Sequence, residues 1–288
     1  MLRVFVDSGS SIKQNEKEKY QVEIIPLKII LGDKEYYDGI NLDNDVFYSY
    51  LKESNDFPKT SLPSLGEIEE RINGYTKGGD DVIILTISSE ISGTYNAMRL
   101  LFEDNDKVRV IDSRLAVGGI RLLVDEINLH RDEDLDQIVE RVNNLIPRIV
   151  IMAIPETLEY LHKGGRLSKM DYILGSLIHI KPIIGFENGK VKMLAKKIGL
   201  KNSMRYIAQS LEELDCDPNY EIIPSMTFNK KNLDLLKSMT NEKFYPQMKV
   251  IDDLDHAIAA HWGPNAFGYI FVKKGSVKSN GVLWGDQF

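Results

Sequence analysis

The stretch DVIILTISSEISGTYNAMRLL, residues 81–101, decides the fold of the first half of this chain. Residues 82–85 form an apolar and largely β-branched run, which is typical of a buried strand. Residues 96–101 contain good helix formers and neither Gly nor Pro, so they predict a helix. A strand that leads through a turn into a helix presents free backbone N–H groups, which suit a phosphate or a carboxylate. The turn here is rich in small residues: Thr86, Ser88, Ser89, Ser92, Gly93 and Thr94.

Two interpretations of this turn remain open. Either Ser92 or Thr94 caps the predicted helix and has no other role, or the turn binds an anion. A nucleotide is not favoured as that anion. The stretch has neither the Gly-x-x-x-x-Gly-Lys-Ser/Thr spacing of a P-loop nor the Gly-x-Gly-x-x-Gly spacing of a Rossmann turn.

Strands alternate with helices on both sides of this stretch. An apolar strand at 2–6 also ends in a loop of small residues, and a hairpin turn is expected at 31–34. This alternation predicts an α/β fold whose N-terminal domain has a parallel sheet with helices on its faces. The other expected strands are 21–31, interrupted at Pro26, and 107–111, and the expected helices are 46–51, 115–128 and 134–145.

The segment from 55 to 63 is expected to be a loop that Pro58 and Pro63 stiffen. Ser64 and Glu67 have the spacing of a capping box for the next helix, so Ser64 has a structural role. Thr60 and Ser61 have no such role. They are either plain turn formers or hydroxyl donors to a ligand.

The pattern changes near Pro147. The dipeptide Asn188-Gly189 lies between two apolar runs and predicts a hairpin. A hairpin among helices predicts a second α/β domain with a mixed, partly antiparallel sheet, which gives domains of 1–150 and 151–288. Arg166 follows two glycines that end a short helix, and its side chain is expected to leave that corner toward solvent or a ligand. The other expected elements are strands at 148–153 and 268–272, helices at 156–162 and 254–260, and alternating helices and strands at 201–214, 220–228, 231–239 and 247–251.

Composition limits the function classes. With 36 Lys and Arg against 43 Asp and Glu, the 288-residue chain has a net charge of −7, which does not favour nucleic acid or an anionic membrane. The single Cys216 excludes an internal disulfide and a cysteine zinc site, and fits the reducing cytoplasm. No signal peptide or transmembrane segment is visible, so we expect a cytoplasmic protein that makes at most transient contact with a membrane surface.

The sequence resembles the DegV-type bacterial fatty-acid-binding proteins. The matching motifs span nearly the whole chain and fall in order, which makes the set specific although each motif alone is weak. They are Asp7-Ser8, Thr60-Ser61-Leu62-Pro63-Ser64, Ser88-Ser89, Ile91-Ser92-Gly93-Thr94-Tyr95, Val110-Ile111-Asp112-Ser113, Thr157-Leu158-Glu159-Tyr160-Leu161, Gly164-Gly165-Arg166-Leu167-Ser168, Leu174-Gly175-Ser176-Leu177, Ile180-Lys181-Pro182-Ile183 and His261-Trp262-Gly263-Pro264.

The resemblance implies two α/β domains with one long-chain fatty acid between them. It implies a lipid-binding protein rather than an enzyme, one that presents the acid to a partner fatty acid kinase in phospholipid metabolism. It implies no cofactor besides the bound acid. Arg166 is expected to face the kinase, and the residues expected to bind the carboxylate are Thr60, Ser61, Ser92, Gly93 and His261.

The chain departs from the family pattern at two places. Residues 9–11 read Gly-Ser-Ser where the family usually has Thr-Ala-Asp, and Trp262 and Asn265 stand where Thr and Gly are usual. The carboxylate motifs are intact. The departures therefore concern chain-length preference and the pocket entrance rather than the class of ligand.

Three other functions fit the sequence less well. A serine hydrolase could use Ser92, His261 and Asp7, but Ser92 lies in Ile-Ser-Gly and not in a Gly-x-Ser-x-Gly elbow. A binder of phosphorylated metabolites would need more basic residues near the two turns. A metal site is not expected, because His256 and His261 are five residues apart and share a helix face poorly.

Overall fold

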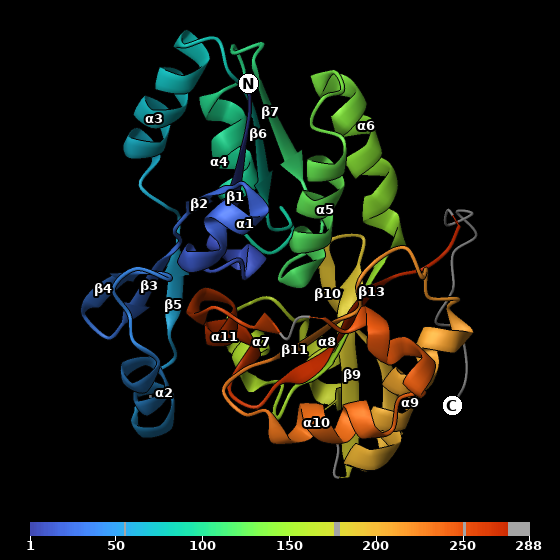
Figure 1. The fold of residues 1–288 in the computed structure, drawn as a ribbon. Coiled ribbons are helices and arrows are strands. Elements are labelled where there is room, and N and C mark those ends of the chain that lie inside the picture. The colour runs from blue at the N-terminus through green and yellow to red at the C-terminus, as the bar shows by residue number, and fades with distance from the viewer. Residues whose placement is uncertain (55, 176–178, 250–251, 276–288) are drawn as a thin grey trace. The chain divides into compact units, whose positions relative to one another are not determined.

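The computed structural model describes residues 1–54, 56–175, 179–249 and 252–275. The chain forms two compact units (Figure 1). The first comprises Met1–Ile146 together with Asn188–Lys190 and Asp253–His261, and the second comprises the rest. A single boundary at 150 would assign both of these short segments to the second domain, whereas they belong to the first unit. The domain limits of 1–150 and 151–288 stay a prediction.

The first unit contains a four-stranded parallel sheet in the order β2-β1-β6-β7. The predicted strand at 82–85 is β6, and all four of these residues are fully buried. Since side chains alternate along a strand, Val82 and Ile84 pack in one apolar cluster with residues of α3 and α4. Ile83 and Leu85 face the opposite side, where α5 and α6 lie in Figure 1. The strands are β1 (Leu2–Asp7), β2 (Glu23–Ile25), β6 (Asp81–Thr86) and β7 (Val108–Asp112).

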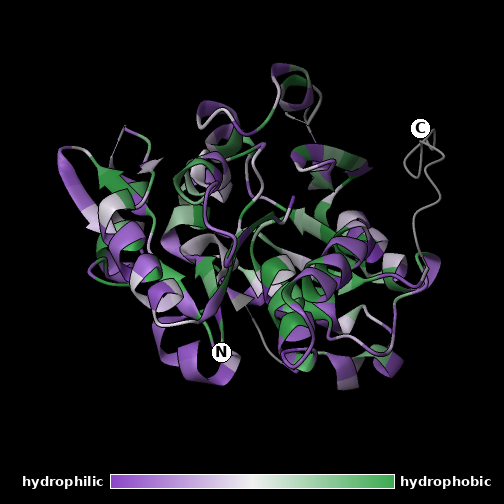
Figure 2. Cartoon of the chain, turned by 90° about the horizontal axis from the view of Figure 1, so that it is seen from above, coloured by the Kyte–Doolittle hydropathy of each residue, from purple (hydrophilic) through white to green (hydrophobic). Residues whose placement is uncertain are grey.

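Amphipathic helices cover this sheet, and Figure 2 shows that many helices carry hydrophobic residues along one side and hydrophilic residues along the other. The predicted capping box is wrong. Ser64 is the N-cap of α3, but its side chain makes no capping bond and its Oγ lies 3.5 Å from the hydroxyl of Tyr37. The helices of the first half are α1 (Lys17–Tyr20), α2 (Asn44–Glu53), α3 (Leu65–Lys77), α4 (Thr94–Leu101), α5 (Gly118–Leu129) and α6 (Leu135–Leu145), with 3₁₀ turns at Ser8–Ser10, Gln14–Glu16 and Ile146–Arg148.

A second, antiparallel sheet of the first unit has the order β4-β3-β5. The predicted hairpin is confirmed, with Gly32 at a φ of +60° in the turn between β3 (Lys28–Leu31) and β4 (Lys34–Tyr37). The prediction of a loop around Thr60 is wrong. Thr60 and Ser61 belong to β5 (Lys59–Ser61), which pairs with β3 so that Thr60 lies opposite Ile29. We name residues 28–61, which hold this sheet and α2, the β3–β5 module.

The second unit is built on a sheet of order β10-β9-β8-β13-β11-β12. The ladders β8·β9, β8·β13 and β11·β13 are antiparallel, and β9 and β10 are joined by the Asn188-Gly189 turn. The α/β fold class, with a parallel first sheet and antiparallel pairing in the second, is confirmed. The elements are β8 (Ile149–Ile154), α7 (Glu159–Lys163), α8 (Lys169–Gly175), β9 (Ile180–Glu187), β10 (Lys190–Ile198), α9 (Leu200–Glu213), β11 (Ile223–Met226), α10 (Lys231–Ser238), a 3₁₀ helix (Glu242–Gln247), β12 (Asp252–Asp253), α11 (His256–Trp262) and β13 (Phe267–Val272).

Two sequence features extend beyond the described residues. The motif at 174–177 and the element expected at 247–251 both include residues that the structure does not describe, so their outcome lies outside the described ranges. Among the helices that are described, none combines the length and the apolar character needed to cross a membrane.

Asp7 ties the end of β1 to the end of β6. Its carboxylate is fully buried and accepts the backbone N–H of Gly9 at 3.0 Å and that of Ile87 at 2.8 Å. Only glycine fits at position 9, since an added Cβ would lie 2.4 Å from the Ile87 side chain. Burial raises the pKa of Asp7 to about 7, although both backbone hydrogen bonds oppose the rise.

Asp7 is therefore expected to make stability fall with pH. The raised pKa means that the stabilising contribution of the protonated carboxyl is complete below 3.8 and is lost as the pH rises through about 7. Urea denaturation across this range should show the native protein losing stability relative to Asp7→Asn, which does not titrate. The exposed Asp104→Asn is the control and should follow the native profile. Parallel pH profiles for the native protein and Asp7→Asn would refute the assignment.

Candidate ligand-binding site

Thr60 and His261 meet in the first unit although 201 residues separate them in sequence. Thr60 lies in the middle of β5, and His261 lies in the last turn of α11. Thr60 Oγ1 and His261 Nε2 are 2.8 Å apart, which is the distance of a good hydrogen bond. The structure thus brings together two of the five predicted carboxylate-binding residues. Both side chains are half-buried, so neither is sealed inside the core.

The turn between β6 and α4 lies close to Leu62, the residue that directly follows β5. The N-cap of α4 is Gly93, so the alternative in which Ser92 or Thr94 occupies the cap position is wrong. Gly93 is exposed, and a Cβ placed there would meet the Leu62 side chain at 3.6 Å. Since Leu62 is two residues from Thr60, the helix start and the strand end are neighbours. The first N–H groups of α4 have no partner within the helix, so this end of α4 favours a negative charge.

The hydroxyl groups of the turn divide into two kinds. Ser88 donates to the carbonyl of Gly189 at 2.7 Å, and Ser89 donates to the Asp112 carboxylate at 2.5 Å. These two serines therefore hold the turn in place. Ser92 Oγ lies 2.9 Å from Thr94 Oγ1 and accepts the Thr94 N–H at 3.3 Å, so it is engaged only by its own turn in these contacts.

Ser61 and Arg166 are placed less tightly. Ser61 is exposed at the end of β5. Arg166 belongs to the second unit, where Gly165 takes a φ of +76° after α7 and the guanidinium donates to the carbonyl of Gly164. Its side chain is half-buried rather than directed freely into solvent, and burial lowers the pKa of Arg166. An arginine remains charged despite such a shift.

The contacts of the proposed hydrolase residues differ from those of a nucleophile–base–acid relay. Both oxygens of Asp7 accept backbone N–H groups, and Ser92 Oγ contacts Thr94. The partner that the structure shows for His261 Nε2 is the hydroxyl of Thr60. Neutral donors such as these can bind and orient an anion, and their arrangement favours binding over nucleophilic attack.

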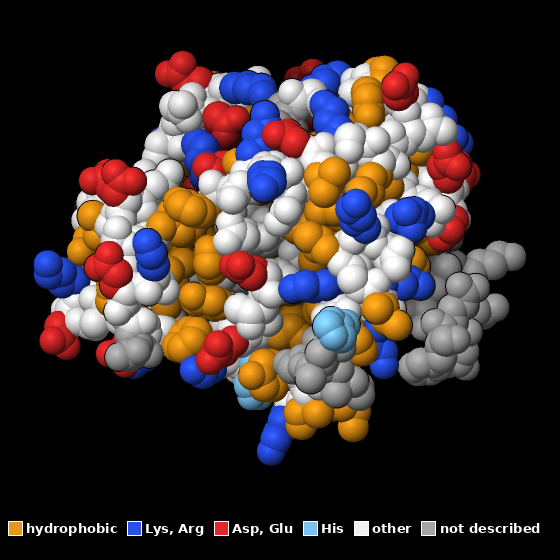
Figure 3. Space-filling view, turned by 90° about the horizontal axis from the view of Figure 1, so that it is seen from below, with side chains coloured by type: hydrophobic (Ala, Val, Ile, Leu, Met, Phe, Trp, Pro, Cys, Tyr) orange, Lys and Arg blue, Asp and Glu red, His pale blue; other side chains and the backbone are white. Residues whose placement is uncertain are grey.

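Two further features bear on the choice of ligand. In the described part of the chain, no three His, Cys, Asp or Glu side chains are grouped so that they could hold a metal ion. On the face shown in Figure 3, acidic and basic side chains are interspersed and hydrophobic side chains lie between them. That face has no continuous basic surface of the kind that binds nucleic acid.

Comparisons with known proteins identify the family. A family model described as "Uncharacterised protein, DegV family" matches residues 1–274. The chain belongs to the DegV family. A DegV domain-containing protein of Clostridium acetobutylicum is 30% identical over an alignment of 293 residues. The alignment covers 95% of this chain and 99% of the relative.

Solved structures agree with this membership. A fatty acid binding DegV family protein from Streptococcus agalactiae matches with a TM-score of 0.85 at 26% identity, over 96% of this chain and 99% of that one. A stearic acid-binding protein from Eubacterium ventriosum matches with a TM-score of 0.83 at 22% identity, over 95% of this chain and 99% of its own, and shows the shared fold. The resemblance inferred from the ordered motifs is confirmed.

Sequence reasoning missed the groups that hold α11. Asp38, Asn44 and Lys13 contact the start of this helix, and all three are more than 200 residues away from it in sequence. The sequence offers His256 only as a possible metal ligand, whereas in the structure its imidazole lies against Asn44. No local pattern predicts such pairings. The only available signal was that Asp253, Asp255 and His256 stand close together where an apolar helix begins.

The Thr60–His261 hydrogen bond gives a direct prediction. Thr60→Val keeps the shape of the side chain but removes the hydroxyl, and should lower the free energy of unfolding by about 0.5–1.5 kcal/mol. Thr60→Ser keeps the hydroxyl and serves as the control. Urea denaturation measures the stability, and the NMR signals of the His261 ring report the contact. If those signals are the same in Thr60→Val as in the native protein, the hydrogen bond is not formed in solution.

Proposed function

We propose that this protein binds one long-chain fatty acid and holds its carboxylate with Thr60, Ser61, Ser92, the N–H groups near Gly93, and His261. The observation that carries the proposal is the Thr60–His261 hydrogen bond, which pre-orients a hydroxyl and an imidazole beside the start of α4. A carboxylate removed from water needs several donors, because an unpaired buried charge is costly. Family membership and the description of the Streptococcus agalactiae relative as fatty acid binding support the same ligand class.

The acyl tail supplies most of the affinity in this proposal. A tail of about 16 carbons, at ~0.8 kcal/mol per buried CH₂ group, provides on the order of 10 kcal/mol. Association costs a comparable ~4–15 kcal/mol. The neutral donors around the carboxylate then fix the orientation of the acid more than its affinity.

We further propose that the bound acid is presented to a partner kinase, which phosphorylates the carboxyl group. Arg166 is the residue through which we expect this partner to act. A guanidinium pairs well with an acidic docking surface or with a transferred phosphate because its planar fork offers parallel N–H donors. The proposed compartment is the cytoplasm, which suits a chain with a single thiol at Cys216.

The ligand proposal is tested on the purified protein. Native mass spectrometry should show a mass excess equal to one long-chain fatty acid, and extraction should release that acid. A nucleotide or a sugar phosphate in its place would contradict the proposal. Removing one donor while the charge stays buried costs ~1–3 kcal/mol, so Ser92→Ala and His261→Ala should each weaken binding roughly ten- to a hundredfold. The exposed Ser49→Ala on α2 is the matched control and should bind normally.

The same variants separate a carrier from a hydrolase. A hydrolase that uses Ser92 and His261 would turn over acyl esters, and Ser92→Ala would abolish that activity. A carrier shows no turnover in the native form or in either variant. Turnover that depends on Ser92 would favour the hydrolase.

Arg166→Ala tests the kinase proposal. The variant should fold and bind fatty acid as the native protein does, because Arg166 is not one of the proposed carboxylate donors. Acyl-phosphate formation with a fatty acid kinase and ATP should be strongly reduced. Arg205→Ala, an exposed arginine of α9 in the same unit, is the control and should support the normal rate. A normal rate with Arg166→Ala would mean that Arg166 serves only the fold.

A further inference from the structure

Helix α11 carries His261 but has few polar groups of its own. Between its two histidines lie Ala257, Ile258, Ala259 and Ala260, all of them buried. The hydrophobic effect that buries these residues is non-directional, so polar contacts supply the directional constraints on such a short helix. The position of His261 therefore depends on the polar contacts made at the ends of α11.

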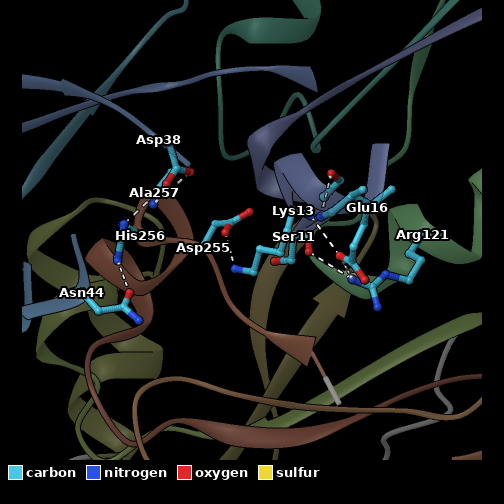
Figure 4. A network of polar contacts seen from close by, with 11 residues as sticks. Ser11, Lys13, Glu16, Asp38, Asn44, Arg121, Asp255, His256 and Ala257 are labelled. Carbon is cyan, nitrogen blue, oxygen red and sulfur yellow. Dashed lines mark hydrogen bonds and ion pairs between the residues drawn. The ribbon is translucent and has the colours of Figure 1, made fainter. Parts of the chain in front are cut away.

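Those contacts at the start of α11 come from three side chains of the first unit (Figure 4). Asp38 Oδ2 accepts the backbone N–H of Ala257 at 3.3 Å. Asn44 Oδ1 lies 2.6 Å from His256 Nε2. Lys13 forms a salt bridge with Asp255, which directly precedes the helix. The helix is thus held at its first turn before Thr60 contacts its last turn.

His256 is enclosed between Asp38 and Asn44. Its ring lies 4.7 Å from the Phe47 ring, centroid to centroid, and its Nδ1 is 3.9 Å from Asp38 Oδ1. Asp38 is fully buried, and its Oδ1 makes no hydrogen bond within the described chain. That oxygen faces the imidazole of His256, and the hydroxyl of Ser8 also interacts with the Asp38 carboxyl group.

The protonation states of this pair follow from burial. Burial lowers the pKa of His256 to about 4, so the imidazole is neutral at neutral pH. An amide oxygen only accepts, so contact with Asn44 Oδ1 puts the ring proton on Nε2 and leaves a lone pair on Nδ1. Burial, followed by the charge of Asp255, raises the pKa of Asp38. A protonated Asp38 can direct its proton toward the Nδ1 lone pair, whereas an ionised Asp38 would be repelled by the partial negative charge of that nitrogen.

The three groups that contact the two histidines all come from the β3–β5 module. Asp38 follows β4, Asn44 is the first residue of α2, and Thr60 lies on β5. A single small sheet with its helix therefore holds both ends of α11. Any displacement of the first turn of α11 would move His261 relative to Thr60.

From this arrangement we propose that Asp38 and Asn44 are positioning residues, which act through His256 and α11 to hold the His261 imidazole against Thr60. The inference rests on the proposed function, because it concerns the same carboxylate site. Neither residue is assigned to contact the fatty acid. Both set the position of His261, which is assigned to contact the fatty acid.

The experiment combines a binding measurement with a ligand-free one. Asp38→Ala should weaken fatty acid binding about tenfold, the effect of losing one well-placed donor. Asp38→Ala combined with His261→Ala should bind no more weakly than His261→Ala alone, because the effect passes through His261. Asp38→Asn should bind as the native protein does, since its amide can accept from Ala257 and donate to His256. Asp45→Ala, which removes an exposed carboxylate from the start of α2, is the control.

The ring signals of His261 in NMR spectra of the ligand-free protein provide the second readout. They should shift in Asp38→Ala and in Asn44→Ala, and stay unchanged in Asp38→Asn and Asp45→Ala. If Asp38→Ala does not fold, Asn44→Ala takes its place, since Asn44 is exposed and its loss leaves the core intact. Unchanged ring signals in the variant that folds would overturn the proposal, as would losses of affinity that multiply in the double variant. If the native protein binds no fatty acid, the proposed function fails, and the ring signals still decide the positioning role.

Discussion

The hydrogen bond between Thr60 and His261 can form because residues 253–261, which follow most of the second unit in sequence, pack as part of the first unit. This segment brings an apolar helix with an acidic and basic start, and the β3–β5 module supplies the polar groups that meet it. A buried carboxyl and a buried imidazole are costly unless each finds a partner. Asp38 and His256 are both buried, and their hydrogen-bond partners are the N–H of Ala257 and the side chain of Asn44. The cost of losing these partners favours one position of α11.

The local part of the fold could be predicted from the sequence. The runs that became β1 and β6, and the hairpins at Gly32 and Asn188-Gly189, are specified by residues adjacent in the chain, through β-branched burial and turn chemistry. The errors arose where a distant residue intervened. Thr60 and Ser61 lie between two prolines and suggest a loop, yet pairing with β3 makes them a strand. Ser64 has a capping-box spacing, but its hydroxyl lies near Tyr37 instead.

The candidate site divides in the same way. Thr60, Ser61, Ser92, Gly93 and His261 could be predicted because they lie in motifs that resemble those of a known family. Such motifs are visible in a single sequence. The residues that hold α11 in place could not be predicted from motifs in this way. Asp38, a lone acid after a strand, is distinguished only by its burial and by a contact 219 residues away. Such roles follow from tertiary structure, which a single sequence does not display.

A site of neutral donors makes particular demands on geometry. An arginine would hold a carboxylate by charge over a range of positions, whereas hydroxyl, imidazole and backbone N–H groups act only at hydrogen-bond distance. In the proposed function the acyl tail provides most of the affinity, so misplaced donors would weaken binding only in part and would leave the bound acid wrongly oriented. A partner that acts on the carboxyl group needs orientation as much as binding. The buried contacts at the start of α11 are then as much a requirement of the site as the donors themselves.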